Sequence, residues 1–585
     1  MSAILGSPRA QLPVPLMRNV LAVLLVLLSA FLLFWRLDGV PLWRDETTTA
    51  NWGRLMAESG VWIPRVFDGE QLIVQAADGH DVNSHLLPAM QSWLQFYVSA
   101  VGFKLLGVST WSARAPFALL GAATLFVLYR VGVVLFGGGA RPLMLPSIGL
   151  LSIYFLYAAR SSRYYVLILL AAALLLLEMC RYLREPERAA SRAFYLRLGL
   201  YGAMLYLSNY VAFAGMWLAL GVFALIEADR RFLRGFVKLS AVLAVLLGIE
   251  FRFLHWEFAG MWPPPIDRSL DEIYAAALTV RGRDFWRAVP LVLLVPVGFF
   301  LFCRRAPSSP PALTALLGGG SLLALSSFFF SASDILALPA AAFWLFASLC
   351  LTVPLGFLWA WRKLPSRGVW SRAALLAGLV LFLSPLFAVA VGKNRVNTRH
   401  YYQTVPAAVL LCALAAAQTR RAAGKRAAAA LLAGVVVWPN LNWNRSGGEQ
   451  MLERQLTRDA SYTQPLIDYL QANLDPGDKI AFFRNVKGMA VYFYIPEMHW
   501  VALLDSEAPH NRQFRGRIPD DQFDDYPGVD WYVFWNPRGG HPRGLDERFE
   551  KVWEYSYPLH GVPWWDRGSK PRTRTYQVYR RKAGI

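Results

Sequence analysis

Cysteine is scarce in this chain, with four residues in 585. Cys180, Cys303, Cys350 and Cys412 lie inside long apolar segments or at their ends. None lies in a segment that we expect outside the cytoplasm, where an oxidising compartment would pair thiols. This distribution excludes a disulfide framework and a cysteine-based metal site. We expect the four side chains to act as small apolar packing groups.

Charge is also sparse. Charged residues make up 17% of the chain and hydrophobic residues 56%, and the mean hydropathy is +0.35. Such a composition excludes an ordinary soluble domain and indicates a polytopic α-helical membrane protein. The net charge of +20 does not point to nucleic acid as a partner, because the basic residues form short clusters between apolar spans rather than one patch. The positive-inside rule explains these clusters.

Apolar segments of membrane-spanning length recur along residues 1–440. About thirteen spans fit one topology with a cytoplasmic N-terminus, at 18–36, 112–136, 143–159, 164–180, 196–208, 211–227, 238–254, 288–303, 311–330, 335–360, 373–391, 403–418 and 427–439. We interpret the first span as a retained helix, because no small-residue cleavage site follows it. Residues 86–106 would reverse the later topology if they crossed, so we predict an interfacial or partly inserted helix there. The expected location is the inner (plasma) membrane.

The tail at 441–585 differs in character, being polar, rich in aromatics and punctuated by Pro and Gly. We predict a small extracytoplasmic α/β domain with a helix over 447–473 that ends at Asp475-Pro476-Gly477-Asp478. Strand-like runs follow at Lys479–Phe483, Val491–Tyr494, Trp531–Trp535 and Tyr576–Tyr579. The tail shows no nucleophile elbow, phosphate-binding loop or zinc-ligand spacing, so we expect it to support acceptor binding or stability.

An acidic pair, Asp45-Glu46, follows the first span in the outer loop 37–111. Carboxylates beside a membrane are costly and usually functional. The simpler interpretation is helix capping, with Asp45 as the N-cap of a helix over 46–58. Glu46 cannot point the same way as Asp45 at a helix start, so we expect it to orient a backbone amide or to bind an ion or acceptor.

Several short motifs follow one another in a specific order along the chain. Asp45-Glu46 is followed by Asn83-Ser84-His85-Leu86-Leu87-Pro88 and by Lys104–Ser109 with Ala113-Arg114-Ala115-Pro116. Arg160-Ser161-Ser162-Arg163-Tyr164-Tyr165 and Arg399-His400-Tyr401-Tyr402 come later. In this order the chain resembles the GT-C superfamily of membrane glycosyltransferases, nearest to the branch of protein O-mannosyltransferases and the lipid A aminoarabinose transferase.

The resemblance implies an inverting transfer of one hexose or pentose from a polyprenyl-phosphate donor to an extracytoplasmic lipid, glycan or protein acceptor. It assigns Asp45 as the base, with Glu46 beside it in the catalytic pair. Cationic and polar residues would contact the donor phosphate: His85, Arg160, Arg163, Arg399 and Tyr401. Substrate contacts are expected from Trp43, Tyr164 and His400. No cofactor is firmly implied and one His without a neighbouring carboxylate makes a poor zinc site, although a divalent cation at Asp45, Glu46 or Asp68 stays an alternative.

Other functions stay open at this point. A glycan ligase or polymerase would also use polyprenyl carriers at the outer face. The resemblance to such enzymes would depend on a large late loop with arginines, whereas here the early loop carries the acidic pair. A lipid-carrier transporter would need mid-span ionisable residues and internal repeats, and neither is evident. A scaffold with an inactive membrane region is a third alternative. The Trp- and Pro-rich loop 255–287 could close over a lipid carrier, or simply form an interfacial tryptophan belt.

Overall fold

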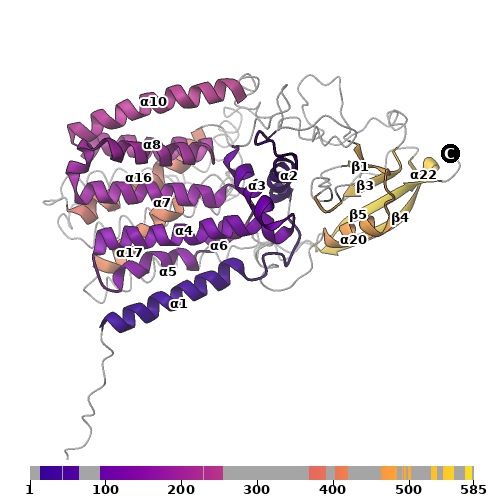
Figure 1. Ribbon diagram of the computed structural model, residues 1–585, viewed down its shortest axis with the longest axis horizontal. Helices are drawn as coiled ribbons and strands as arrows, with labels where there is room; N and C mark the ends of the chain where they lie inside the picture. Colours follow the sequence, from indigo (N-terminus) through magenta and orange to yellow (C-terminus); the bar gives the residue numbers. More distant parts are fainter. Residues whose placement is uncertain are drawn as a thin grey trace, which may run out of the picture.

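The computed structural model describes residues 14–42, 44–64, 92–227, 229–254, 368–390, 402, 404–418, 463–483, 491, 493–495, 499–501, 529–535, 545–558 and 573–582. Within these ranges a bundle of long helices lies beside a smaller unit built on a β-sheet (Figure 1). The predicted spans at 288–303, 311–330, 335–360 and 427–439 lie outside the described residues, as does the loop 255–287.

The bundle is formed by helices at most of the predicted positions. They are α1 (Val14–Phe34), α4 (Thr110–Phe136), α5 (Met144–Leu151), α6 (Ile153–Arg160), α7 (Tyr165–Arg184), α8 (Arg192–Tyr206), α9 (Tyr210–Glu227), α10 (Arg230–Leu254), α16 (Val369–Ala390) and α17 (Thr404–Gln418). Short 3-10 helices lie at Arg141–Leu143 (η2) and Pro186–Ala190 (η3). In the described part, α4, α7 and residues Arg230–Glu250 are long and apolar enough to cross a membrane.

The prediction of one continuous helix over 143–159 is wrong, because two helices occupy this segment. Helix α5 ends at Leu151, Ser152 is extended (φ −76°, ψ 119°), and α6 begins at Ile153. The segments Arg141–Leu151 and Tyr154–Arg160 are bent by 73° relative to each other, as in a broken span or a re-entrant loop. The break carries the end of α6 toward α1, and places Arg160 beside the C-terminal end of that helix.

Helix α7 is the centre of the bundle. Almost every side chain along it is buried, including apolar residues on all sides such as Val166, Leu169 and Leu176. It packs against α4, α8, α16 and α17. By contrast α1 exposes Val23, Val26 and Leu27, as expected for a lipid-facing helix. Because α7 is packed on every side, its first turn is a rigid support for the two residues just before it, Arg163 and Tyr164.

Two helices lie across the end of the bundle where α4 and α7 begin (Figure 1). They are α2 (Arg44–Ser59) and α3 (Leu94–Leu106), which pack on each other and, through α3, on α4. With 13 residues, α3 is only about 20 Å long, too short to span a hydrocarbon core of roughly 30 Å. Gly53 permits the close packing, because a Cβ there would lie 2.6 Å from the Cβ of Ser99. The membrane-interface location of this helix stays a prediction.

The C-terminal unit contains a five-stranded sheet of order β2-β1-β3-β5-β4. Its elements are α20 (Gln464–Asn473), β1 (Lys479–Phe483), β2 (His499–Val501), β3 (Trp531–Trp535), α22 (Leu545–Arg548), β4 (Phe549–Pro558) and β5 (Thr573–Arg581). Strand β1 is parallel to β2 and β3, and β5 is antiparallel to β3 and β4. Side chains alternate between two faces, with Ile480, Trp531 and Val533 packed with α20 and the other face packed near α22.

The predicted strands at 479–483 and 531–535 are confirmed, and 576–579 is the middle of β5. The strand expected at 491–494 is wrong, since Val491, Phe493 and Tyr494 are helical. Strands β2 and β4 were not predicted. The described end of the expected helix 447–473 is α20. The extracytoplasmic location of this unit stays a prediction.

Candidate functional site

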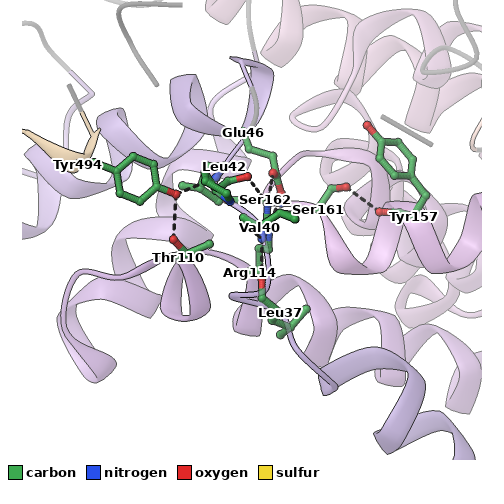
Figure 2. A network of polar contacts seen from close by, with 11 residues as sticks. Leu37, Val40, Leu42, Glu46, Thr110, Arg114, Tyr157, Ser161, Ser162 and Tyr494 are labelled. Atoms are coloured by element: carbon green, nitrogen blue, oxygen red, sulfur yellow. Dashed lines mark hydrogen bonds and ion pairs between the residues drawn. The ribbon is translucent and has the colours of Figure 1, made fainter. Parts of the chain in front are cut away.

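A buried ion pair joins α2 to α4 at the end of the bundle. The side chains of Glu46 and Arg114 are 1% and 0% exposed. Arg114 Nε donates to Glu46 Oε1 at 2.9 Å, and a terminal nitrogen of Arg114 donates to Glu46 Oε2 at 2.6 Å. This two-point contact is the strongest geometry available to a carboxylate and a guanidinium. Figure 2 shows Glu46, Arg114 and the residues around them.

The remaining N–H groups of Arg114 bind the connection between α1 and α2. They donate to the carbonyl oxygens of Leu37 and Val40 (Figure 2) and to that of Pro41. A guanidinium has five N–H groups, and all five have an acceptor here. This complete pairing offsets the cost of burying the charge. The loop that leads into Asp45 is therefore wrapped around one side chain of α4.

Glu46 also fixes the turn between α6 and α7. The backbone N–H of Ser162 donates to Glu46 Oε1 at 2.8 Å, which agrees with the expectation that Glu46 orients a backbone amide. Both carboxylate oxygens have partners and the side chain is buried, so Glu46 ties together α2, α4 and the 161–163 turn. Its expected place in the catalytic pair stays a prediction.

Asp45 lies in the first turn of α2, whose first residue is Arg44. The capping alternative placed Asp45 one residue before the helix, so the described helix start does not match it. Acidic residues are favourable in a first turn because of the helix dipole. The Asp45 side chain lies outside the described residues, as does Trp43, and the role of Asp45 as a base stays a prediction.

Arg160 holds α1. Its two terminal nitrogens donate to the carbonyl oxygens of Leu32 at 2.6 Å and Trp35 at 2.7 Å. These carbonyls lie at the end of α1, where the last carbonyls of a helix have no partner within the helix. The side chain is 1% exposed. The described contacts thus tie Arg160 to the end of α1, and the donor-phosphate role predicted for it stays a prediction.

Arg163 lies between α2, α3 and α7. It is 3% exposed, and one terminal nitrogen donates to Thr49 Oγ1 at 3.0 Å. The Thr49 hydroxyl in turn donates to Gln95 Oε1 at 2.9 Å. The guanidinium also lies over the ring of Tyr164, 5.0 Å from its centroid. Thr49 is four residues after Asp45, so Arg163 contacts α2 one helical turn from Asp45. The structure therefore brings together Arg163, Tyr164 and the helix that carries Asp45.

A tyrosine cluster links the 160–165 segment to the start of α17. Tyr165 stacks on Tyr402 with ring centroids 4.8 Å apart, and contacts Tyr157 and Tyr164 at 5.8 and 4.9 Å. Tyr402 follows directly on Arg399, His400 and Tyr401, which lie outside the described residues together with His85. Tyr402, the one described residue of the predicted segment 399–402, thus meets the segment 160–165.

The C-terminal unit reaches the same end of the bundle. The hydroxyl of Tyr494 accepts a hydrogen bond from the Leu42 N–H at 2.8 Å and shares another with Thr110 Oγ1 at 2.9 Å (Figure 2). Phe493 lies against Phe103 of α3, with centroids 6.0 Å apart. Burial raises the pKa of Tyr494 above its ordinary value. The sequence did not predict this contact, because nothing local indicates which residues a distant segment packs against.

Arg114 is the principal residue that the sequence did not single out, although it lies inside one of the motifs. The available signal was a charged residue near the start of an apolar span, because such a charge needs a buried partner. Among the described residues, no group of three or more His, Cys, Asp or Glu side chains is placed to hold a metal ion.

No protein-family model matches the chain, and no curated protein matches it. It is similar to solved structures of ArnT from Cupriavidus metallidurans, in the apo state (15% identity, TM-score 0.46) and bound to undecaprenyl phosphate (15%, 0.45). Each of these comparisons covers 96% of this chain and 98% of the other. The oligosaccharyltransferase of Archaeoglobus fulgidus, in complex with zinc and sulfate, is similar at 14% identity and a TM-score of 0.46, over 88% of this chain and 67% of that one.

Proposed function

We propose that this protein is an inverting glycosyltransferase that moves one monosaccharide from a polyprenyl phosphate to an acceptor outside the cytoplasm. The observation that carries the proposal is the anchoring of α2. Glu46 ties the first turn of this helix to Arg114 and Ser162, and Arg163 contacts it one turn later. Three of the motifs that resemble the GT-C superfamily in sequence, at 45–46, 113–116 and 160–165, are therefore in contact in the fold.

The proposed reaction needs one base at the outer face. The Asp45 carboxylate would take the proton of an acceptor hydroxyl while that oxygen attacks the anomeric carbon of the sugar. The bond from this carbon to the phosphate oxygen breaks, and its electron pair leaves with the polyprenyl phosphate. The departing group is already an anion, so cationic contacts suffice to stabilise it. Attack from the opposite side of the ring inverts the anomeric centre.

Cations for the phosphate would come from two segments. Arg163 lies two residues before α7, and Arg399 and Tyr401 directly precede Tyr402, whose ring stacks on Tyr165. His85 completes the proposed set, with Trp43, Tyr164 and His400 as substrate contacts. Arg160 is the remaining proposed phosphate contact, and its guanidinium also binds two carbonyl oxygens at the end of α1.

The experiment uses the full chain in lipid vesicles with a panel of polyprenyl-phosphate sugars and acceptor mixtures. Asp45→Asn is compared with wild type, and Asp38→Asn is the matched control because Asp38 is an exposed carboxylate in the adjoining loop. We expect sugar release to fall about 10²-fold or more in Asp45→Asn, as for loss of a general base, and to persist in Asp38→Asn. The donor that reacts would identify the sugar.

Two results would count against the proposal. Equal release by wild type and Asp45→Asn would remove Asp45 as the base. Failure of folded wild type to release sugar from every donor would overturn glycosyl transfer itself.

A further inference from the structure

A second polar site lies at the opposite end of the bundle. Five arginines and Glu185 line a pocket of about 590 Å³ there, together with Val133 and Val134 of α4. The arginines are Arg130 of α4, Arg181 and Arg184 of α7, Arg188 of η3 and Arg197 of α8. Along α4, Arg130 is 16 residues from Arg114, which corresponds to about 24 Å. In Figure 1 this is the end of α4 and α7 that points away from the sheet.

The pocket retains a positive charge after its internal ion pairs are formed. Glu178 is fully buried and lies 2.5 Å from a terminal nitrogen of Arg181 and 3.2 Å from Arg197 Nε. Glu185 pairs with Arg188 at 2.6 Å. Five arginines thus face two carboxylates. Within the described residues, neither Arg130 nor Arg184 forms an ion pair, and Arg184 donates to the carbonyl oxygen of Val134.

The buried Glu178 gives the pocket a fixed shape. A single carboxylate holds one arginine from its own helix and one from α8, and the two guanidiniums remain 27% and 36% exposed. Arginines of a merely solvated surface have no such shared anchor. Guanidinium groups held in this way are well suited to phosphate oxygens, which accept two parallel hydrogen bonds.

Exposed apolar side chains continue from the pocket along two helices. Phe126 is four residues before Arg130 on α4 and is 60% exposed. Leu200 is three residues after Arg197 on α8 and is 63% exposed. Residues at these spacings share a helix face. A ligand with a phosphate in the pocket could therefore lay hydrocarbon chains over Phe126 and Leu200.

We propose that this arginine pocket binds the phosphate of an anionic membrane phospholipid. The shared chemistry is a phosphate group, and the adjoining apolar faces favour a lipid over a free anion. The positive-inside rule predicts this end to be cytoplasmic, where anionic headgroups meet basic pockets between membrane helices. The site is independent of the proposed transferase reaction at the other end of the bundle.

The test measures binding to the purified full chain in a non-ionic detergent. The probes are dioctanoyl phosphatidylglycerol, dioctanoyl phosphatidylcholine and inorganic phosphate. We expect the phosphatidylglycerol to bind at least tenfold more tightly than either of the others. Arg130→Gln should weaken it about tenfold or more, the size expected for one lost charge-assisted contact. Arg130→Lys should recover part of the binding, because lysine keeps the charge but not the two parallel hydrogen bonds; a purely structural role would not predict this partial recovery.

The matched control is Arg141→Gln. Arg141 is an exposed arginine of η2 at the same end of the bundle and does not line the pocket. It should leave binding within twofold of wild type. Inorganic phosphate that binds as tightly as phosphatidylglycerol would overturn the lipid assignment. Unchanged phosphatidylglycerol binding in Arg130→Gln, or an equal loss in Arg141→Gln, would overturn the site.

Discussion

Removal of the charge on Glu46 tests whether the ion pair to Arg114 holds the site together. Glu46→Gln preserves the size of the side chain but leaves a fully buried guanidinium without its counter-ion. Breaking a buried pair from one side costs about 3–5 kcal/mol. The amide also adds a donor where Arg114 and the Ser162 N–H already donate. We therefore expect a large loss of stability from a single isosteric change.

The matched control is Glu58→Gln on the same helix. Glu58 pairs with Arg54 at 2.8 Å, but it is 50% exposed. An exposed i,i+4 pair of this kind contributes about 0.3–0.5 kcal/mol. The two variants remove the same charge from the same helix and differ in burial, so the difference between them reports the buried pair.

The assay is the unfolding half-life of the full chain in detergent at a fixed temperature, because large membrane proteins rarely unfold reversibly. A loss of about 3 kcal/mol that acts mainly on the unfolding rate shortens the half-life by roughly 10²-fold. Glu58→Gln should stay within about threefold of wild type. Arg114→Lys separates charge from geometry, since lysine keeps the charge but has three donors for five acceptors. We expect it to be destabilised as well.

A half-life of Glu46→Gln that matches Glu58→Gln would refute the buried pair as the anchor of α2. Wild-type stability in Arg114→Lys would refute the stabilising role of its five-point contact. The two outcomes are separable, because the first concerns the charge and the second the number of hydrogen bonds.

Two further predictions concern contacts around the same end of the bundle. Thr49→Val removes the hydroxyl between Arg163 and Gln95. On the proposed function we expect the KM for the polyprenyl-phosphate sugar to change more than kcat in steady-state kinetics. An unchanged KM with a loss of stability alone would contradict this expectation. Tyr494→Phe leaves the Leu42 N–H without its acceptor, at a cost of about 1–3 kcal/mol, and should speed limited proteolysis of the C-terminal unit. Because burial raises the Tyr494 pKa, the folded state binds the phenol proton more tightly than the unfolded chain, whose value is about 10; this stabilisation is complete below pH 10 and is lost as the pH rises through the folded pKa. The rate of limited proteolysis of wild type should therefore increase above pH 10 more than that of Tyr494→Phe. Identical pH profiles of the two proteins would contradict this role of the Tyr494 hydroxyl.

The sequence predicted the positions of several strands and helices better than the breaks within them. Strands β1 and β3 occur at the predicted residues because each is a compact apolar and aromatic run. The run 491–494 has the same composition, but its described residues Val491, Phe493 and Tyr494 are helical, since packing overrides strand propensity in short runs. Strand β4 carries Glu550, Lys551 and Glu554 among its aromatics, which hid its alternation. The break at Ser152 had no local signal, because neither Pro nor Gly lies at that position.

The residues that sequence reasoning placed least well are the charged ones at the ends of apolar helices. The positive-inside rule explains arginines by location, and the arginines at 181–197, which the rule predicts to be cytoplasmic, are partly exposed. Arg114, Arg160 and Arg163 lie at the other end, where the rule predicts few, and all three are buried. Each has a specific acceptor in another element: Glu46, the carbonyls of α1, or Thr49. An arginine on the side that the rule disfavours is retained at an energetic cost, so in a chain of this class such residues are the first candidates for buried anchors around a site.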